Sequence, residues 1–159
     1  MRVFVRGSKL MKFRFVWIGK TKDKQWTLQD EYLQRLSHFV KFEISEIRES
    51  AAHDTKEAEG KRILANLNQT SFVCLLDVRG NEISSHQLAE KIENWQNRSV
   101  KEITFIICGQ DGASSEVAEN ADYSLSLSRL TLTHEMARVI LVEQLYRAYT
   151  IIKGFPYQK

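Results

Sequence analysis

The sequence predicts an α/β fold in which helices cover both faces of a mainly parallel sheet. Strand-like and helix-like segments alternate along most of the chain, and this alternation favours the α/β class. Two strand-like segments, residues 71–78 and 102–109, are almost continuously apolar. Such runs are typical of parallel strands that are buried on both faces.

The individual elements follow from local spacing. Apolar residues recur with a helical period in some segments, and they alternate or form short runs in others. The sequence therefore predicts strands over residues 13–19, 42–47, 71–78 and 102–109, helices over 25–39, 54–68 and 85–95, and a turn at 79–81.

Length and composition are consistent with one globular domain. The 159 residues can bury one sizeable core but hardly two. Residues 1–10 are interpreted as an N-terminal extension ahead of Met11, and residues 11–159 as a single domain. Because no apolar run is long enough for a membrane span and no secretory signal is recognisable, a cytoplasmic protein is expected. The net charge of +3 is compatible with a nucleic-acid partner without requiring one.

The two cysteines, Cys74 and Cys108, each lie in a strand-like apolar run. Reduced thiols in the core are therefore expected rather than a disulfide. The chain has no CxxC motif and no Cys/His cluster in its sequence, so no metal site is expected.

The last third of the chain predicts a long helix that begins after a capping Thr133. Apolar residues occupy nearly every face of this helix, which indicates burial on more than one side. Ile140, Leu145 and Tyr149 cannot all face one sheet, so a second subunit is expected to cover the remaining side. The sequence therefore predicts a homodimer.

Three loop-forming segments follow strands: residues 75–80, 106–112 and 126–132. Ligands of parallel sheets bind at the carboxyl ends of the strands. The chain has neither a Walker A loop nor a dinucleotide fingerprint, which favours a cofactor without phosphate groups. The leucine-rich loop 127–132 could enclose an adenine between apolar side chains, although a short strand leading into the last helix fits the same pattern.

The order and the motifs of these segments resemble the RlmH family of SPOUT-class methyltransferases. The resemblance runs from Met11 to Lys159, and it is carried by LLDVRG, IICGQDG and LSLSRLTLTHEMARVILVEQLYRA, with Pro-Tyr near the end. It implies a C-terminal segment threaded into a trefoil knot, a homodimer, and S-adenosyl-L-methionine as the methyl donor. It also implies methylation of N3 of a pseudouridine in the 23S rRNA of the assembled ribosome.

The resemblance also implies which residues contact the cofactor. They are Leu76 after one strand, Cys108 and Gly109 in the next loop, and the leucine-rich loop itself, Leu127, Ser128, Arg129, Leu130, Thr131 and Leu132. The family usually has glycine where this chain has Cys108, and histidine where this chain has Gln158.

Four residues are candidates for the chemistry. His134 is the only side-chain candidate for a base, although an ordinary polar residue of the first helical turn fits its position equally well. Arg147 is expected to contact RNA or the transition state, with a structural pair to Glu143 as the alternative. In the tail, Tyr157 is expected to stack on the target base and Lys159 to offer a cation.

Two other functions remain open. A knotted methyltransferase acting on tRNA belongs to the same enzyme class, but such enzymes commonly carry an RNA-binding appendage for which 159 residues leave no room. A non-catalytic, ribosome-binding dimer is the second alternative, and it is suggested by Cys108 and Gln158.

Overall fold

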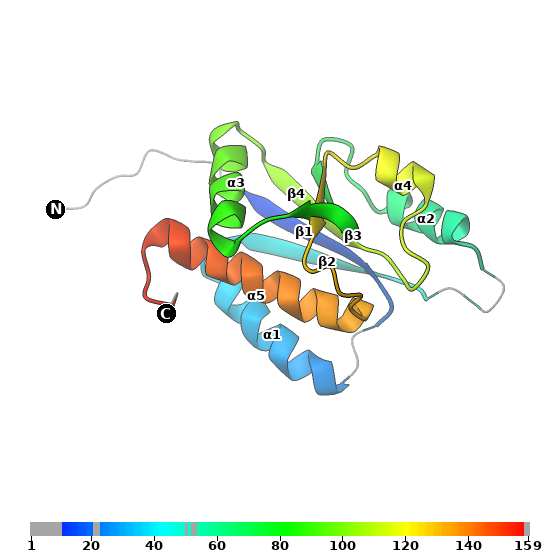
Figure 1. Ribbon diagram of the computed structural model, residues 1–159, viewed down its shortest axis with the longest axis horizontal. Coiled ribbons are helices and arrows are strands. Elements are labelled where there is room, and N and C mark those ends of the chain that lie inside the picture. The colour runs from blue at the N-terminus through cyan, green and yellow to red at the C-terminus, as the bar shows by residue number, and fades with distance from the viewer. Residues whose placement is uncertain (1–10, 21–22, 50, 52–53, 158–159) are drawn as a thin grey trace.

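Strands and helices alternate along the chain (Figure 1). The computed structural model describes residues 11–20, 23–49, 51 and 54–157, and for residues 23–27 it describes the backbone only. The extension predicted at residues 1–10 lies outside the described residues. The elements are β1 (Lys12–Ile18), α1 (Asp23–Ser37), β2 (Lys41–Ile47), α2 (Lys56–Ala65), β3 (Phe72–Glu82), α3 (Ser85–Asn97), β4 (Glu102–Ile107), α4 (Ser115–Glu119), β5 (Tyr123–Ser126) and α5 (His134–Lys153).

The strands form one five-stranded sheet in the order β2-β1-β4-β3-β5. All four pairings are parallel, which confirms the predicted mainly parallel sheet. Each connection between successive strands contains a helix, as parallel neighbours require. Because β4, β3 and β5 are neighbours in the sheet, the loops that follow them meet at one edge. The trefoil knot stays a prediction.

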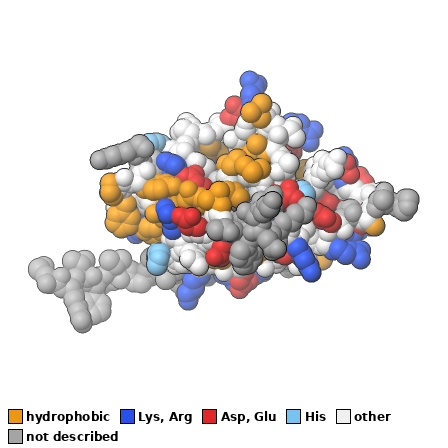
Figure 2. All heavy atoms as spheres, turned by 90° about the horizontal axis from the view of Figure 1, so that it is seen from below, with side chains coloured by type: hydrophobic (Ala, Val, Ile, Leu, Met, Phe, Trp, Pro, Cys, Tyr) orange, Lys and Arg blue, Asp and Glu red, His pale blue; other side chains and the backbone are white. Residues whose placement is uncertain are grey.

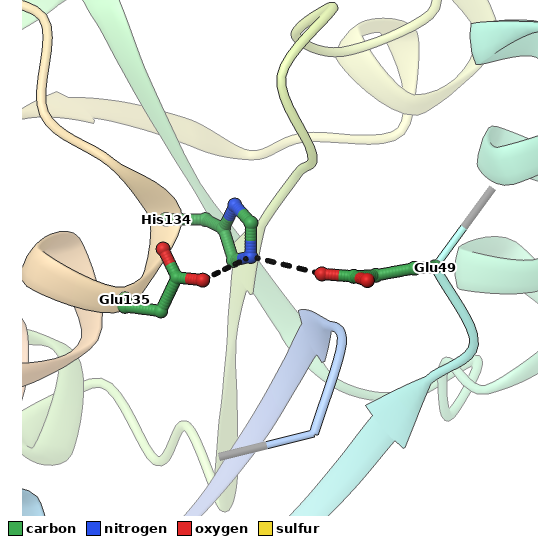
Figure 3. Close-up of side chains that lie close together, drawn as sticks. All are labelled: Glu49, His134 and Glu135. Carbon is green, nitrogen blue, oxygen red and sulfur yellow. Dashed lines mark ion pairs between the residues drawn. The ribbon is translucent and has the colours of Figure 1, made fainter. Parts of the chain in front are cut away.

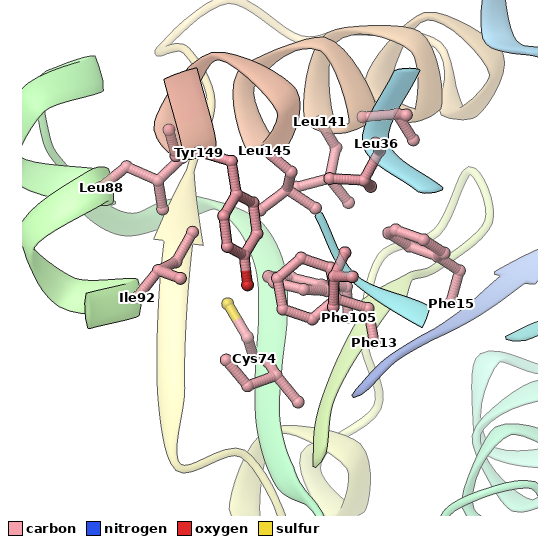
Figure 4. Close-up of a cluster of buried hydrophobic side chains, with 14 of the residues drawn as sticks. Phe13, Phe15, Leu36, Cys74, Leu88, Ile92, Phe105, Leu141, Leu145 and Tyr149 are labelled. Carbon is pink, nitrogen blue, oxygen red and sulfur yellow. The ribbon is translucent and has the colours of Figure 1, made fainter. Parts of the chain in front are cut away.

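The larger core lies between the sheet and the layer of α1, α3 and α5 (Figure 4). The rings of Phe13 and Phe15 on β1 pack against Phe105 on β4, with centroid distances of 5.2 and 5.8 Å. Leu141 and Leu145 of α5 are completely buried against this layer. Aromatic residues of the central strands therefore provide the surface on which the last helix packs.

The two shorter helices, α2 and α4, cover the opposite face of the sheet (Figure 1). Val16 and Ile18 of β1 are buried there with Ile63 of α2 and Val117 of α4. Helices thus cover both faces, which confirms the predicted architecture. Nearer the amino ends of the strands this face carries an ion-paired group, Lys12, Arg14, Glu43 and Glu102.

The predicted turn at residues 79–81 is wrong, because β3 continues through it. The strand pairs with β5 on both sides of a register shift between Leu76 and Asn81. Gly80 makes this possible: a Cβ on it would lie 2.8 Å from the backbone carbonyl carbon of Ser124. The side-chain amide of Asn81 also donates to the carbonyl oxygen of Ser124 at 3.0 Å. Residue types that are common in turns here allow two neighbouring strands to approach closely.

The short helix α4 has no counterpart among the predicted elements. It begins after Ser114, whose hydroxyl accepts the Val117 N–H at 3.2 Å. With five residues, α4 is too short to show a helical period in the sequence.

Helix α5 begins after Thr133, whose hydroxyl accepts the Met136 N–H at 3.2 Å, and this confirms the predicted cap. The helix packs between α1 and α3 (Figure 1). Leu145 and Tyr149 are buried within this chain, so these two residues need no second subunit, whereas Ile140 is half-buried. The homodimer stays a prediction. Neither α5 nor another helix of the described residues is long and apolar enough to cross a membrane.

We expect Gly80→Ala to destabilise the protein, because the added methyl group would meet the backbone of β5. Overpacking of this kind typically costs about 1–3 kcal/mol. Urea unfolding measures the change in the free energy of unfolding. Val78→Ala is the control on the same strand, since Val78 is exposed and its truncation should have a small effect. Equal effects of the two substitutions would contradict the close approach.

Candidate active site

A cavity of about 670 Å³ opens at the carboxyl ends of β3, β4 and β5. Its size lies in the range of small-molecule sites, which is about 300–1,000 Å³. The walls come from residues 76–79, 107–113, 125, 127–128 and 130–135, together with Lys56 and Ala137. The three segments whose sequence predicts ligand binding therefore lie side by side around one cavity, although residues 75–80 belong to β3 and do not form the predicted loop after it.

The predicted cofactor residues lie around this cavity, with one exception. Arg129 is exposed and forms an ion pair with Glu82 at 2.9 Å instead of lining the wall. The others all line the cavity: Leu76, Cys108, Gly109, Leu127, Ser128, Leu130, Thr131 and Leu132.

Short hydrogen bonds within the leucine-rich loop define its path. The hydroxyl of Ser126, at the end of β5, donates to the Ser128 carbonyl oxygen at 3.0 Å. The Ser128 hydroxyl in turn accepts the Leu130 N–H at 3.0 Å. Serines between the leucines thus satisfy backbone groups locally and form turns of the kind that compete with regular strands. The alternating pattern therefore gives a short strand followed by a shaped loop.

Glu59 of α2 is a site residue that the sequence did not reveal. Its carboxylate is buried and accepts the Gly109 N–H at 2.9 Å, so it fixes the loop that follows β4. A Cβ on Gly109 would lie 2.7 Å from Oε2 of Glu59, so a side chain at this position would have to displace the carboxylate. The only signal in the sequence is a glutamate on the same helical face as the buried Ile63.

Cys108 lies in the cavity wall and not within a strand, because β4 ends at Ile107. Its thiol is free, as is that of Cys74, which confirms the predicted absence of a disulfide among the described residues. Burial raises the pKa of the Cys108 thiol to about 12, and the carboxylates of Glu59 and Asp77 act in the same direction. The thiol is therefore protonated at neutral pH and is a poor nucleophile.

His134 stands at the start of α5 and lines the cavity. Its Nε2 lies 3.0 Å from Oε1 of Glu135 and 3.5 Å from Oε1 of Glu49 (Figure 3). Glu49 follows β2, so the contact joins two segments that are distant in the sequence. His134 therefore lies in the cavity wall, while its role as a base stays a prediction.

The first turn of α5 is tied to β1 by Arg138, which is almost completely buried. Its Nη2 donates to the carbonyl oxygen of Ile18 and, at 2.9 Å, to that of Gly19. The guanidinium also lies over the ring of Trp17, 5.1 Å from the centroid. Burial lowers the pKa of Arg138, although nearby carboxylates act in the opposite direction.

Arg147 and Tyr157 form a second group at the other end of α5. Nε of Arg147 donates to Oε1 of Glu143 at 3.0 Å, and the guanidinium lies over the ring of Tyr157 at 4.8 Å. The Tyr157 hydroxyl donates to the same carboxylate oxygen at 3.1 Å. Burial, and hydrogen bonds with Tyr32 and Glu143, raise the pKa of Tyr157 above its usual range. Lys159 and Gln158 lie outside the described residues.

The three predicted catalytic residues that the structure describes, His134, Arg147 and Tyr157, are therefore not brought together within one chain. His134 and Arg147 are separated by thirteen positions on α5, which corresponds to roughly 20 Å at about 1.5 Å per residue. His134 belongs to the cavity, whereas Arg147 and Tyr157 lie in the group near the C-terminus.

Residues 11–158 of the chain match the protein family described as "Predicted SPOUT methyltransferase". The chain belongs to the SPOUT methyltransferase family. As a member of this family it is a methyltransferase, which confirms the enzyme class predicted from its motifs.

Curated relatives of the same length support this membership. A protein of Desulfotalea psychrophila named Ribosomal RNA large subunit methyltransferase H is 41% identical over 153 residues, which cover 94% of this chain and 100% of the relative. A protein of Halothermothrix orenii with the same name is 40% identical over 159 residues, with the same two coverages.

Solved structures of methylase-family proteins share the fold. One from Haemophilus influenzae has a TM-score of 0.56 at 14% identity and covers 92% of this chain and 70% of its own. One from Neisseria gonorrhoeae has a TM-score of 0.54 at 9% identity and covers 98% of this chain and 99% of its own. At these identities the likeness concerns the fold alone.

We expect Gly109→Ala to destabilise the protein through Glu59 and not by filling the cavity. The added methyl group would displace the buried carboxylate, at a typical cost of about 1–3 kcal/mol. Glu59→Ala in the same chain removes the clash, so the double variant should lose less stability than the sum of the single variants. Urea unfolding of the four chains measures this coupling. Additive losses would contradict the assignment.

Proposed function

We propose that the chain transfers a methyl group from S-adenosyl-L-methionine to N3 of a pseudouridine in 23S rRNA. The observation that carries the proposal is the cavity lined by all three segments predicted to bind the cofactor, residues 75–80, 106–112 and 126–132. The names of the relatives support ribosomal RNA as the substrate class. The resemblance in the motifs supports the nucleotide and the position on its ring.

The residues around the cavity fit S-adenosyl-L-methionine. Leu127 and Leu132 offer apolar surface for an adenine, and the Asp77 carboxylate in the wall suits a ligand that carries positive charge. When bound, the cofactor supplies a methyl group already activated on its sulfonium. Placement of the two reactants then accounts for much of the rate. Since the Cys108 thiol is protonated, it does not compete for the methyl group.

The chemistry also requires that the proton on N3 of the pseudouridine leaves. His134 is the candidate acceptor in the cavity wall, because an imidazole nitrogen can act as a general base. Loss of the proton places negative charge on the flanking oxygens of the ring. A cation such as Arg147 or Lys159 would stabilise that charge if it were near the base.

A homodimer would bring the two groups together, because the tail of one chain could reach the cavity of its partner. Figure 2 shows hydrophobic side chains gathered in a band across the side of the molecule seen from below in Figure 1, where α1 and α5 lie. Leu28 on α1, Met136 on α5 and Phe155 in the tail are exposed apolar residues of these elements. Exposed apolar surface of this kind is typical of interfaces.

One experiment distinguishes this proposal from its alternatives. Mass mapping of modified nucleotides in rRNA and tRNA from a deletion strain should show the loss of one methylated pseudouridine in 23S rRNA. Loss of a methyl group from tRNA instead would favour the tRNA enzyme. An unchanged set of modifications, together with no binding of S-adenosyl-L-methionine by calorimetry, would favour the non-catalytic dimer.

We expect Leu127→Asp to weaken the binding of S-adenosyl-L-methionine at least about tenfold, because a leucine contact is worth roughly 1.5–3 kcal/mol. Calorimetry measures the dissociation constant. Arg129→Ala is the control in the same loop: this side chain pairs with Glu82 outside the cavity, so its loss should leave the affinity unchanged. If both variants bind normally, the adenine lies elsewhere.

Deletion of Tyr157–Lys159 should abolish methylation of the rRNA while the affinity for S-adenosyl-L-methionine falls much less. The reason is that Tyr157 belongs to the group at the far end of α5 and not to the cavity wall. Methyl incorporation and calorimetry give the two readouts. Gln158→His should leave activity within a modest factor.

The same deletion also tests the homodimer. Mixed dimers of the tail-deleted chain with a His134→Ala chain should regain activity if each site combines the cavity of one chain with the tail of the other. An absence of rescue in proven mixed dimers would contradict a site shared between chains.

A further inference from the structure

Three potential metal ligands converge at the rim of the cavity (Figure 3). His134, Glu135 and Glu49 each present a ligand atom, and these atoms lie within 4.8 Å of one another. Two of the residues also line the cavity, and the third reaches them from the segment after β2. We propose that these three residues bind a divalent transition-metal ion of the zinc class.

The spacing of the ligand atoms fits such an ion. Zinc binds nitrogen at about 2.0–2.1 Å and carboxylate oxygen at about 2.0–2.2 Å, so ligand atoms in a tetrahedron lie roughly 3.3–3.5 Å apart. Nε2 of His134 lies 3.0 Å from the Glu135 oxygen and 3.5 Å from the Glu49 oxygen. All three ligand atoms lie within 4.8 Å of one another, so two of the three separations are already close to those of a tetrahedron and a bound ion would draw the two carboxylates together.

Hydrogen bonding alone is a poorer account of this convergence. Nε2 of a histidine carries at most one hydrogen, and that hydrogen cannot make full hydrogen bonds to two carboxylates on different segments. A metal ion accepts an electron pair from the nitrogen and from both oxygens at once. Imidazole with carboxylates is also a ligand set that suits zinc and neighbouring transition metals.

The surrounding charges also favour a cation. The carboxylates of Glu46, Glu49 and Glu135 attract the positive charge of Arg138. The guanidinium of Arg138 itself donates hydrogen bonds to the carbonyl oxygens at the end of β1. Glu49 and Glu135 thus place two carboxylates at the rim, and a bound divalent ion would offset their charge where RNA phosphates would otherwise be repelled.

Occupation of the site has a chemical consequence. The metal ion and a proton compete for the same lone pair on Nε2, so a loaded chain has no free imidazole base at this position. Three protein ligands leave the fourth position of a zinc ion open to water. The inference itself needs neither the cofactor nor the RNA substrate, and it can therefore fail independently of the proposed function.

The test is a titration of the full-length, metal-free chain with Zn²⁺ by calorimetry and with Co²⁺ by visible absorption. Neither RNA nor S-adenosyl-L-methionine is present. We expect one ion per chain and the intense visible bands of four-coordinate Co²⁺. Glu49→Gln and His134→Ala should each weaken metal binding at least about tenfold. Mutation of residues that only hydrogen-bond to a metal ligand already lowers metal affinity about 10–100-fold.

Glu46→Gln is the matched control, because it removes the same charge near Arg138 without removing one of the three ligands. It should leave the affinity within about a factor of two to three. The Glu49 side chain is largely exposed, so its variant should keep the thermal unfolding midpoint of the unmodified chain. The inference is overturned if the unmodified chain binds no stoichiometric ion, or if Glu46→Gln weakens binding as much as Glu49→Gln.

Discussion

The buried guanidinium of Arg138 holds the start of α5 against the end of β1, and this contact positions one wall of the cavity. A buried charge is costly unless it is hydrogen-bonded, and here the carbonyl oxygens of Ile18 and Gly19 supply the acceptors. The ring of Trp17 adds a favourable contact with the cation. The first helical turn, which carries His134, is therefore held against the end of β1. From there α5 runs over the aromatic core of the sheet, so the contacts that stabilise the fold also position the site.

The cavity is held from both helical layers. On one side, α5 contributes its first turn and the leucine-rich loop that precedes it. On the other side, Glu59 of α2 binds the Gly109 N–H and keeps the next loop in place. Gly80 allows β3, which contributes residues 76–79 to the cavity, to lie close to the backbone of β5. Since the strand order makes β4, β3 and β5 neighbours, residues far apart in sequence are brought to one edge.

The fold class and the three segments that line the cavity could be predicted from the sequence because their signals are local. Apolar runs identify buried parallel strands, and loops such as 106–112 directly follow them. Glu59 and Glu49 could not be recognised, because each lies in a charged segment that resembles an ordinary solvent-exposed surface. Their partners, Gly109 and His134, are distant in the sequence and become neighbours only through the sheet order. The prediction of a turn at residues 79–81 failed because the residue types there are typical of turns, whereas in this fold they allow two strands to pack closely.

The chemistry of the tail limits what its groups can contribute. Because the pKa of Tyr157 is raised, its hydroxyl stays neutral and donates to Glu143, so it is suited to hydrogen bonding and not to proton removal. Arg147 is fixed by the same carboxylate and offers a permanent cation over the tyrosine ring. Both groups are therefore suited to recognise the base and to stabilise its anion. Under the proposed function, the proton acceptor and the groups that stabilise the anion lie at opposite ends of α5, which is why the proposal places one active site between two chains.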